Sequence, residues 1–439
     1  MTRLFLEYAI PSALAMFIAS FNTVLDGVFL GNGVGDLALA AVNIVMPLTI
    51  IFFGLATMVA VGGGALVSKN FGAGNDKKAI NIFRQVMKFL VIASLILSIV
   101  CMLFSKQIVM LMGATENTKG LASEYLKYYS AFCIPNLLGI ALGSFVRNDN
   151  KPNLAMIATI IGTIFNVLLN YIFIFKLNLG IKSAAIATGL GQMVTVLIII
   201  PHFIYKKGKL TFGESKMEKE IILETLKVGL PSFVAEAAFS IIILIHNIFI
   251  TVVIGEIGLS VYAVINYITT NIYLILLGVT LGAQPLMSYN FGAKNAEKII
   301  KVYDLAIKTS AIISFIFFLI CLILGKQIIS IFTSDKSIIE MSYIALNLTN
   351  LAYFLIGKNL TTTVYYQAIE ITKYSNLIGA FRSILILPIA LIILSKLFGA
   401  NGIWISMFVS EFFTMILIGK IANIKKCTYK SITIKNSWI

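Results

Sequence analysis

The amino-acid sequence predicts an all-α integral membrane protein with twelve transmembrane helices in two six-helix lobes, related by a parallel internal repeat. Three observations lead to this prediction: the composition, the succession of long apolar segments, and a motif that recurs in the second half. Of the 439 residues, 59% are hydrophobic and only 12% are charged, which is about half the charge of a typical soluble domain. This composition excludes a water-soluble globular fold, and the high hydrophobicity also excludes a disordered chain.

Apolar segments long enough to span a membrane recur along the whole chain, since a bilayer core requires about 20 apolar residues per helix. The first six predicted spans are residues 8–30, 39–66, 86–112, 122–146, 153–176 and 183–205. The second six are residues 229–253, 260–287, 304–325, 338–368, 376–396 and 400–422. The segments 122–146 and 338–368 are the weakest, because both carry many polar groups. No small-residue cleavage site follows the first segment, so we expect it to be a span and not a signal peptide.

The basic residues predict the orientation of these spans. The chain has 34 Lys and Arg against 19 Asp and Glu, a formal net charge of +15. If the amino terminus is inside, most of these basic residues fall on the inner side of the membrane. In this assignment Lys373 and Arg382 belong to the inner loop after residue 368. The positive-inside rule then places both termini in the cytoplasm. Because the charges are spread over alternate loops and form no single basic face, nucleic acid is excluded as a partner.

An internal repeat relates the two halves of the chain. Residues 70–75 read NFGAGN and residues 290–295 read NFGAKN, an offset of 220 (290 − 70). The same offset relates Pro11 to Pro231 and Gly62 to Gly282. Six spans per half is an even number, so both halves have the same orientation in the membrane. Such parallel repeats place a substrate path between the halves, near the membrane midplane.

The repeat also divides the chain into predicted domains. We expect an N-lobe (1–205), a cytoplasmic inter-lobe linker (206–228), a C-lobe (229–423) and a cytoplasmic tail (424–439). The linker ends in EKEIILETLKVG (218–229), which is typical of a short amphipathic helix on the inner membrane surface.

Asp26 is the first candidate for a functional residue. It lies within the first predicted span, where a carboxylate is costly unless it is paired, hydrated or protonated. Asn22 lies one turn earlier on the same helical face and can hydrogen-bond to Asp26. The alternative is a protonated acid that only ties helices together.

The second half offers its own candidates. Glu236 is an acid within the seventh span, which either contacts a cation or substrate or makes an inter-helix hydrogen bond. The repeat aligns Asp26 with His246, which is followed by Asn247. Imidazole changes its charge near neutral pH, so we consider a proton-carrying role for His246 beside the commoner structural one.

Further polar residues within the spans either line a substrate cavity or connect helices. They are Gln192, Asn266, Gln284, Lys358 and Glu411. Lys358 either pairs with an acid such as Glu236 or extends toward the membrane surface. We expect Arg147 and Asp149 to form a solvated pair in an inner loop. Four scattered cysteines and two histidines predict neither a disulfide framework nor a metal site other than one for Na⁺.

Five segments carry a resemblance to a known family. They read IPSALAMFIASFNTVLDGVFLGN (10–32), GGGALVSKNFGAGN (62–75), SFVRNDNKPNLAMIATIIGTIFNVLLNYIFIF (144–175), GAQPLMSYNFGAKN (282–295) and YYQAIEITK (365–373). Over essentially its whole length the chain resembles the multidrug and toxic compound extrusion (MATE) family, particularly its branch of small bacterial multidrug exporters. The resemblance implies twelve helices in two lobes around a V-shaped cavity. It also implies export of cationic amphiphilic compounds against an inward flow of H⁺ or Na⁺.

The same resemblance implies a coupling site. In that branch a first-span Asp cooperates with an Asn and an acid four residues apart in the fifth span, and with a Thr in the sixth. The matching residues here are Asp26, Asn166, Asn170 and Thr188. The i, i+4 spacing places both asparagines on one helical face, and their oxygens suit a hard cation. Position 170 is Asn where the branch usually has Asp, so one carboxylate of a Na⁺ site is missing.

We therefore predict a secondary antiporter, and not an enzyme, that confers antibiotic resistance from the plasma (inner) membrane of a bacterium. Its expected partners are small cationic amphiphiles and membrane lipids. We expect a monomer without a cofactor, with H⁺ or Na⁺ as the coupling ion. The alternative is a lipid-linked oligosaccharide flippase or a polysaccharide exporter of the same superfamily. A membrane-embedded enzyme would need an HxxxD, an HExxH or paired intramembrane aspartates, and a passive channel seldom needs such a repeat.

Overall fold

The described part of the chain is built from helices. The computed structural model describes residues 1–421, apart from the side chains of Thr23, Asp36, Phe239, Ser240, Leu244, Glu256 and Ile421. The predicted tail (424–439) lies outside these residues. Within them, ten helices are long and apolar enough to cross a membrane, or up to twelve if two bent helix pairs each count as one span. The bent pairs coincide with the two spans whose polar groups made them the weakest in the sequence.

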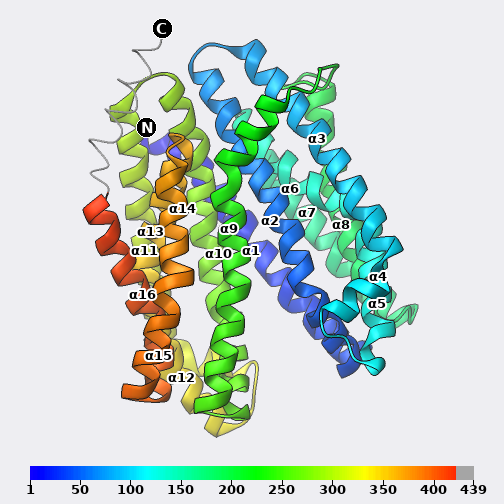
Figure 1. Cartoon of the computed structure of the whole chain (residues 1–439), viewed down its shortest axis with the longest axis vertical. Helices are drawn as coiled ribbons and strands as arrows, with labels where there is room; N and C mark the ends of the chain where they lie inside the picture. The colour runs from blue at the N-terminus through cyan, green and yellow to red at the C-terminus, as the bar shows by residue number, and fades with distance from the viewer. Residues whose placement is uncertain (422–439) are drawn as a thin grey trace. The chain divides into compact units, whose positions relative to one another are not determined.

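The first half, blue to green in Figure 1, supplies eight α-helices and one π-helical segment. They are α1 (Thr2–Gly33), α2 (Asp36–Gly72), α3 (Asp76–Leu103), α4 (Ser105–Leu111), α5 (Glu116–Ala131), α6 (Cys133–Asn148), α7 (Pro152–Tyr171), η1 (Ile172–Lys176) and α8 (Lys182–Ile204). The axes of α5 and α6 differ by 52° across a short break. Pro152 at the start of α7 lacks a backbone N–H that the first helical turn would leave unpaired in any case.

The second half follows a similar order, with one long helix in place of α3 and α4 and a π-helical segment in the middle of a span. Its elements are α9 (Lys219–Val253), α10 (Glu256–Gly292), α11 (Ala296–Ser330), α12 (Lys336–Asn350), α13 (Tyr353–Ala368), α14 (Thr372–Ala380), η2 (Phe381–Ile386), α15 (Leu387–Phe398) and α16 (Ala400–Ile421). The prediction of a separate amphipathic helix at 218–229 is wrong, because from Lys219 these residues are the first turns of α9. At the start of α12, hydrogen bonds from the Ser337 hydroxyl and from its backbone N–H hold the pKa of the capping Asp335 below its usual range.

The repeat extends to the backbone conformation. Helices α2 and α10 begin and end 220 residues apart. Left-handed backbone recurs at the same offset in three pairs: Gly35 with Gly255, Gly74 with Lys294, and Asn150 with Glu370. Non-glycine residues rarely adopt positive φ, so these matches are not explained by shared apolar composition. The two halves therefore fold alike at their turns as well as in their helices.

The described chain forms two compact units, one of residues 14–233 and the other of residues 1–13 together with those from 234 onward. The divisions fall inside α1 and α9. In the second of these units, Gly282 of α10 lies against α1, and a Cβ there would be 2.6 Å from the Tyr8 carbonyl oxygen and 2.8 Å from the Ala9 Cα. In the unit of residues 14–233, the repeat-related Gly62 lies in the same way against the backbone of α9 at Thr225 and Gly229. Glycine at these positions lets two helix backbones approach closely.

Gly282→Ala is therefore expected to lower the free energy of unfolding by about 1–3 kcal/mol, the usual consequence of overpacking. The added methyl group would meet backbone atoms, which cannot rotate away as a side chain can. Gly379→Ala in α14 is the matched control, because no atom lies within 4 Å of a Cβ there. Thermal unfolding in detergent measures both variants, and equal shifts of the two midpoints would contradict the close-approach explanation.

The prediction of a solvated Arg147–Asp149 pair is wrong, because both residues are buried, with 8% and 3% of their surface exposed. Asp149 Oδ2 lies 2.7 Å from His202 Nε2. The Asp149 carboxylate also accepts hydrogen bonds from the backbone N–H groups of Lys209 at 2.9 Å and Leu210 at 3.3 Å. A buried carboxylate requires such partners, and these partners fasten the segment after α8 to the end of α6.

Candidate functional site

A polar cluster in the unit of residues 14–233 contains Asp26, which is half-buried. Asn170 Nδ2 of α7 donates a hydrogen bond to Asp26 Oδ1 at 2.5 Å, and Asn22 Nδ2 donates to Asp26 Oδ2 at 3.2 Å. Asn22 precedes Asp26 by one helical turn, as the sequence indicates. Both oxygens of the single carboxylate thus have an amide donor, one from its own helix and one from α7.

The cluster continues from α7 to α8. Asn170 Nδ2 lies 3.4 Å from Asn166 Oδ1, and Asn166 Nδ2 donates to Thr188 Oγ1 at 3.1 Å. Asn166 and Asn170 are 3% and 0% exposed. The structure therefore brings together, in one chain of hydrogen bonds across three helices, all five residues that we predicted for the coupling site.

The cluster also contains oxygen atoms without a partner. Asn22 Oδ1 and Asn170 Oδ1 are buried and accept no hydrogen bond from the described residues. Unpaired buried acceptors are unfavourable, and each belongs to an amide whose nitrogen already contacts Asp26. Two free amide oxygens beside a carboxylate suit a small hard cation or a bound water.

Aromatic side chains of α1, α5, α7 and η1 lie near this cluster. Tyr125 of α5 interacts electrostatically with Asp26. The end of α1 packs on the end of α7 and on η1, since the Phe29 ring lies 6.4 Å from that of Tyr171 and 5.8 Å from that of Phe175. Short π-helical segments such as η1 often occur at functional sites. Here η1 begins two residues after Asn170.

The second unit contains a buried ion pair. Arg382 Nε lies 2.8 Å from Glu411 Oε1, and the two side chains are 13% and 2% exposed. Asn359 Nδ2 donates to Glu411 Oε2 at 2.7 Å and to the Glu411 carbonyl at 3.0 Å. The assignment of Arg382 to an inner loop is thus wrong, because it lies in η2, ten residues into the eleventh span. A buried guanidinium needs a carboxylate partner, which α16 supplies.

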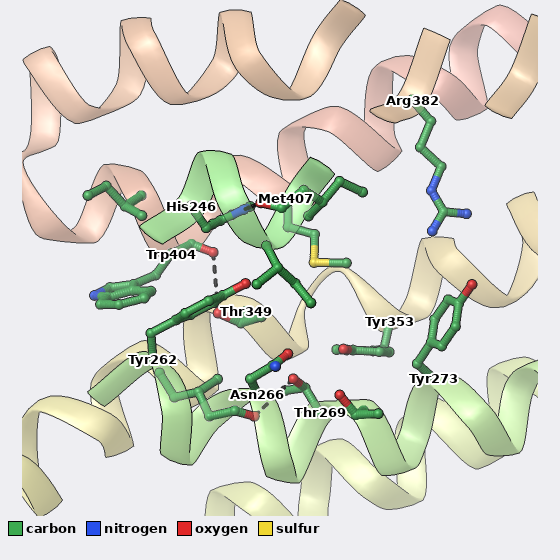
Figure 2. A pocket seen from close by; sticks show the side chains of 15 residues that line it. His246, Tyr262, Asn266, Thr269, Tyr273, Thr349, Tyr353, Arg382, Trp404 and Met407 are labelled. Atoms are coloured by element: carbon green, nitrogen blue, oxygen red, sulfur yellow. Dashed lines mark hydrogen bonds between the residues drawn. The ribbon is translucent and has the colours of Figure 1, made fainter. Parts of the chain in front are cut away.

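A small cavity of about 50 Å³ lies beside this pair. Figure 2 shows Tyr273 of α10 pointing toward the Arg382 guanidinium, with which it forms a side-chain hydrogen bond. Other aromatic and polar side chains, Tyr262, Asn266, Tyr353 and Trp404 among them, come from α10, α13 and α16. The cavity has room for a few waters, so it is too small for a drug-sized substrate.

Two predicted residues in α9 lie near these groups. His246 lines the cavity, stacks on the Tyr262 ring at 5.6 Å, and has its Nδ1 2.9 Å from the Ile242 carbonyl oxygen. This contact gives Nδ1 a backbone partner, as the structural alternative for His246 expects. Glu236 is half-buried and interacts electrostatically with Tyr273. Asn247, which follows His246 in the chain, is also half-buried.

The remaining candidates take no part in the hydrogen bonds of the two clusters described above. Gln284 is buried and donates to Ser288 Oγ at 3.3 Å, while Gln192 lies against Gly139 of α6. Lys358 is half-buried in α13, and no ion pair joins it to Glu236 in the part of the chain that the structure describes. Sequence reasoning missed Arg382 and Asn359 as polar partners of Glu411. An arginine within the apolar stretch 376–396, followed by an acid in the next span, was the signal that could have revealed the pair.

Ten to twelve apolar spans, a structural repeat and charged groups within spans of both units together define a multi-pass membrane transporter. The MatE family model matches residues 11–172 and again residues 231–392. The two matches begin 220 residues apart, at the offset of the internal repeat. The chain belongs to the MatE family, and it is therefore a transporter and not an enzyme.

Bacterial relatives match along most of the chain. The Multidrug export protein MepA of Staphylococcus saprophyticus is 27% identical over 414 residues, which cover 92% of this chain and 90% of that protein. The protein of the same name in Staphylococcus haemolyticus is 24% identical over 424 residues, covering 95% and 93%.

Solved structures share the fold. An outward-facing multidrug resistance MATE family transporter of the MOP superfamily is similar with a TM-score of 0.91 and 23% identity, covering 99% of this chain and 96% of that one. A MOP superfamily transporter from Pyrococcus furiosus, described as having a binding pocket of reverse polarity that suggests a different function, is similar with a TM-score of 0.89 and 23% identity. It also covers 99% of this chain and 96% of that chain.

Proposed function

We propose that this transporter is a secondary antiporter that exports cationic or amphiphilic compounds in exchange for H⁺ or Na⁺. The observation that supports this most directly is the Asp26 carboxylate held by Asn22 and Asn170 inside the membrane span. The bacterial relatives named as multidrug export proteins support the substrate class. We further propose a monomer in a bacterial plasma membrane, with both termini cytoplasmic and the lobe boundaries given above.

In the proposed mechanism, Asp26 carries the coupling ion. With Asp26 ionised, its two oxygens accept from one amide on α1 and one on α7. Protonation replaces one acceptor by a donor, so one of these amides must turn its oxygen toward the acid or lose its partner. The contact between α1 and α7 is therefore sensitive to the ionisation of Asp26, which would bias the unit between two packings as the halves alternate access.

The composition of the cluster favours H⁺ over Na⁺. A Na⁺ ion would take the carboxylate of Asp26 together with amide oxygens and the Thr188 hydroxyl. With Asn at position 170, this set carries one negative charge, so a bound Na⁺ would be neutralised by a single acid. A proton needs only that one carboxylate, and this leads us to propose H⁺ as the main coupling ion.

The test is efflux of ethidium from proteoliposomes under separately imposed pH and Na⁺ gradients. We expect an inward H⁺ gradient to drive ethidium transport and an inward Na⁺ gradient alone to drive little. Protein-free liposomes and a protonophore supply the controls. Transport that follows neither gradient would refute the antiporter, whereas transport that follows only Na⁺ would refute H⁺ coupling.

The alternative is a flippase or exporter of lipid-linked or polymeric sugars within the same superfamily. Lys358 favours an anionic substrate, because it is half-buried and joins no ion pair among the described residues. The neighbouring Pyrococcus structure indicates that this fold accommodates pockets of different polarity. Under this alternative, the same proteoliposomes would not transport ethidium, and Lys358→Gln would impair transport of the anionic substrate.

A further inference from the structure

A groove of about 1020 Å³ opens on the unit of residues 14–233, beside α3 and the segment that follows α8. One part of its lining is apolar, with Met87, Val91, Ile92, Leu138, Leu142 and Ile200. The other part carries Arg84, Lys88 and Lys216, together with the single acid Glu214. The groove is separate from the Asp26 cluster, because it shares no residue with it.

The basic side chains of the groove are not neutralised by acids. Arg84 donates to the carbonyl oxygens of Thr211 at 2.9 Å, Phe212 at 3.3 Å and Glu214 at 3.4 Å, and to Thr211 Oγ1 at 3.0 Å. All these acceptors are uncharged. No ion pair joins Arg84, Lys88 or Lys216 to an acid in the described part of the chain. The groove is therefore lined by three basic residues and one acid, which give it a positive potential.

The wall formed by residues 211–216 is held in place. Besides the Arg84 hydrogen bonds, Gln85 Oε1 accepts from the Glu218 backbone N–H at 2.7 Å, and Gln85 Nε2 donates to Glu218 Oε1 at 2.9 Å. A second acid, Glu218, follows this wall in the chain, and its carboxylate accepts hydrogen bonds from Asn81 and Gln85. At the other end, Asp149 binds the backbone of Lys209 and Leu210. The groove is therefore a formed site, with one wall on a face of α3 and another on an anchored segment.

The position of the groove along α3 relates it to the membrane surface. From Asp76 to Lys88 the helix carries most of its polar residues, and from Phe89 to Leu103 it is apolar. Lys88 therefore marks the polar–apolar boundary. Val91 and Ile92 lie one turn further along on the same face as Lys88 and are 38% and 40% exposed. This pattern predicts headgroup level for the basic end of the groove and acyl-chain level for its apolar end.

We propose that this groove binds an anionic phospholipid. Its phosphate contacts Lys88 and Lys216 beside the Arg84 guanidinium, and an acyl chain lies along Val91, Ile92 and Leu138. Basic pockets between transmembrane helices at the membrane surface bind anionic lipid headgroups in this way. The site is independent of the coupling ion and of the exported compound.

The internal repeat supplies a matched comparison. The counterpart of Lys88 at offset 220 is Lys308 in α11, but the counterpart of Arg84 is Asp304. An acid one turn from the lysine weakens the attraction for an anion. We therefore assign the lipid site to the first half of the chain and not to its repeat.

Native mass spectrometry of the full-length protein in detergent tests this assignment, with phosphatidylglycerol and phosphatidylcholine as probes. We expect Lys88→Gln with Lys216→Gln to weaken phosphatidylglycerol binding about 25-fold, about fivefold per lysine. The control removes the same charge from α11, as Lys301→Gln with Lys308→Gln, and is expected to bind normally. Equal weakening in both double variants would overturn the proposal, as would equal binding of the two lipids by the unmodified protein.

A second variant tests the apolar part of the groove without changing its charge. Ile92→Trp places a larger ring on the proposed acyl path and is expected to reduce lipid occupancy while thermal stability is kept, because Ile92 is 40% exposed. Unchanged occupancy in Ile92→Trp would contradict an acyl-chain path. Binding of inorganic phosphate to the groove without binding of phosphatidylglycerol would show an anion site without a lipid and would also overturn the proposal.

Discussion

Asp26→Asn is expected to reduce gradient-driven efflux to the level of protein-free liposomes and to remove its dependence on pH. Asparagine has nearly the shape of aspartic acid, so the helices should still pack, but an amide neither takes up nor releases a proton in this range. Asn22 and Asn170 would then face a third amide in place of a carboxylate. The measurement is ethidium efflux in proteoliposomes at imposed gradients between pH 6 and pH 8.

Two further variants make this result specific. Glu236→Gln removes the other acid considered for coupling, and under the proposed mechanism it keeps the pH dependence. Asn170→Asp adds the carboxylate that the related branch usually has, and it is expected to make efflux respond to a Na⁺ gradient. If Asp26→Asn retained efflux with its normal pH profile, the proposed role of Asp26 would be wrong.

Breaking the Arg382–Glu411 pair is expected to have the largest effect on stability. Glu411→Ala would leave the Arg382 guanidinium buried without a counter-charge and would also remove an acceptor of Asn359. Removing one partner of a buried ion pair typically costs about 3–5 kcal/mol. Arg382→Ala should be similarly destabilising, because it leaves a carboxylate with 2% exposure unpaired. Thermal unfolding in detergent, with the midpoint as readout, measures both losses.

The double variant Arg382→Met with Glu411→Leu distinguishes lost pairing from lost packing. Apolar replacements of similar volume often restore the stability of a broken buried pair, so we expect the double variant to unfold close to the unmodified protein. Lys326→Met is the surface control, because it breaks the 2.6 Å pair between Lys326 and Glu340. The side chains of Lys326 and Glu340 are 48% and 61% exposed. Such a surface pair contributes at most about 1 kcal/mol. If the losses of the two single variants added up in the double variant, uncompensated charge would not be their cause.

Much of the fold was predictable because hydropathy is a local property. A window of about 20 apolar residues identifies a span without knowledge of its neighbours. The two spans with the most polar residues, 122–146 and 338–368, turned out to be bent helix pairs. The repeat was equally visible, and the same offset appears in the helix ends and in the left-handed turns at Gly35 and Gly255.

The Asp26 cluster was predictable for a different reason. An isolated acid in an apolar span stands out by its cost, and Asn22 follows from helical spacing alone. The partners on α7 and α8 came from the resemblance to a family, since nothing local relates Asp26 to Asn170, 144 residues away. Residue spacing could place Asn166 beside Asn170 but could not bring either of them to α1.

The sequence by itself determined the membrane spans, their pairing by the repeat and the intramembrane acids, since these depend on residue composition within one helix. Only the tertiary structure decided the partners of the charged groups. Arg382 looked like a loop cation until α16 brought Glu411 to it, and Asp149 looked solvated until His202 and the segment after α8 covered it. The free energy of a buried charge depends on what lies across from it in space, and that neighbour is set by helix packing between segments far apart in the chain.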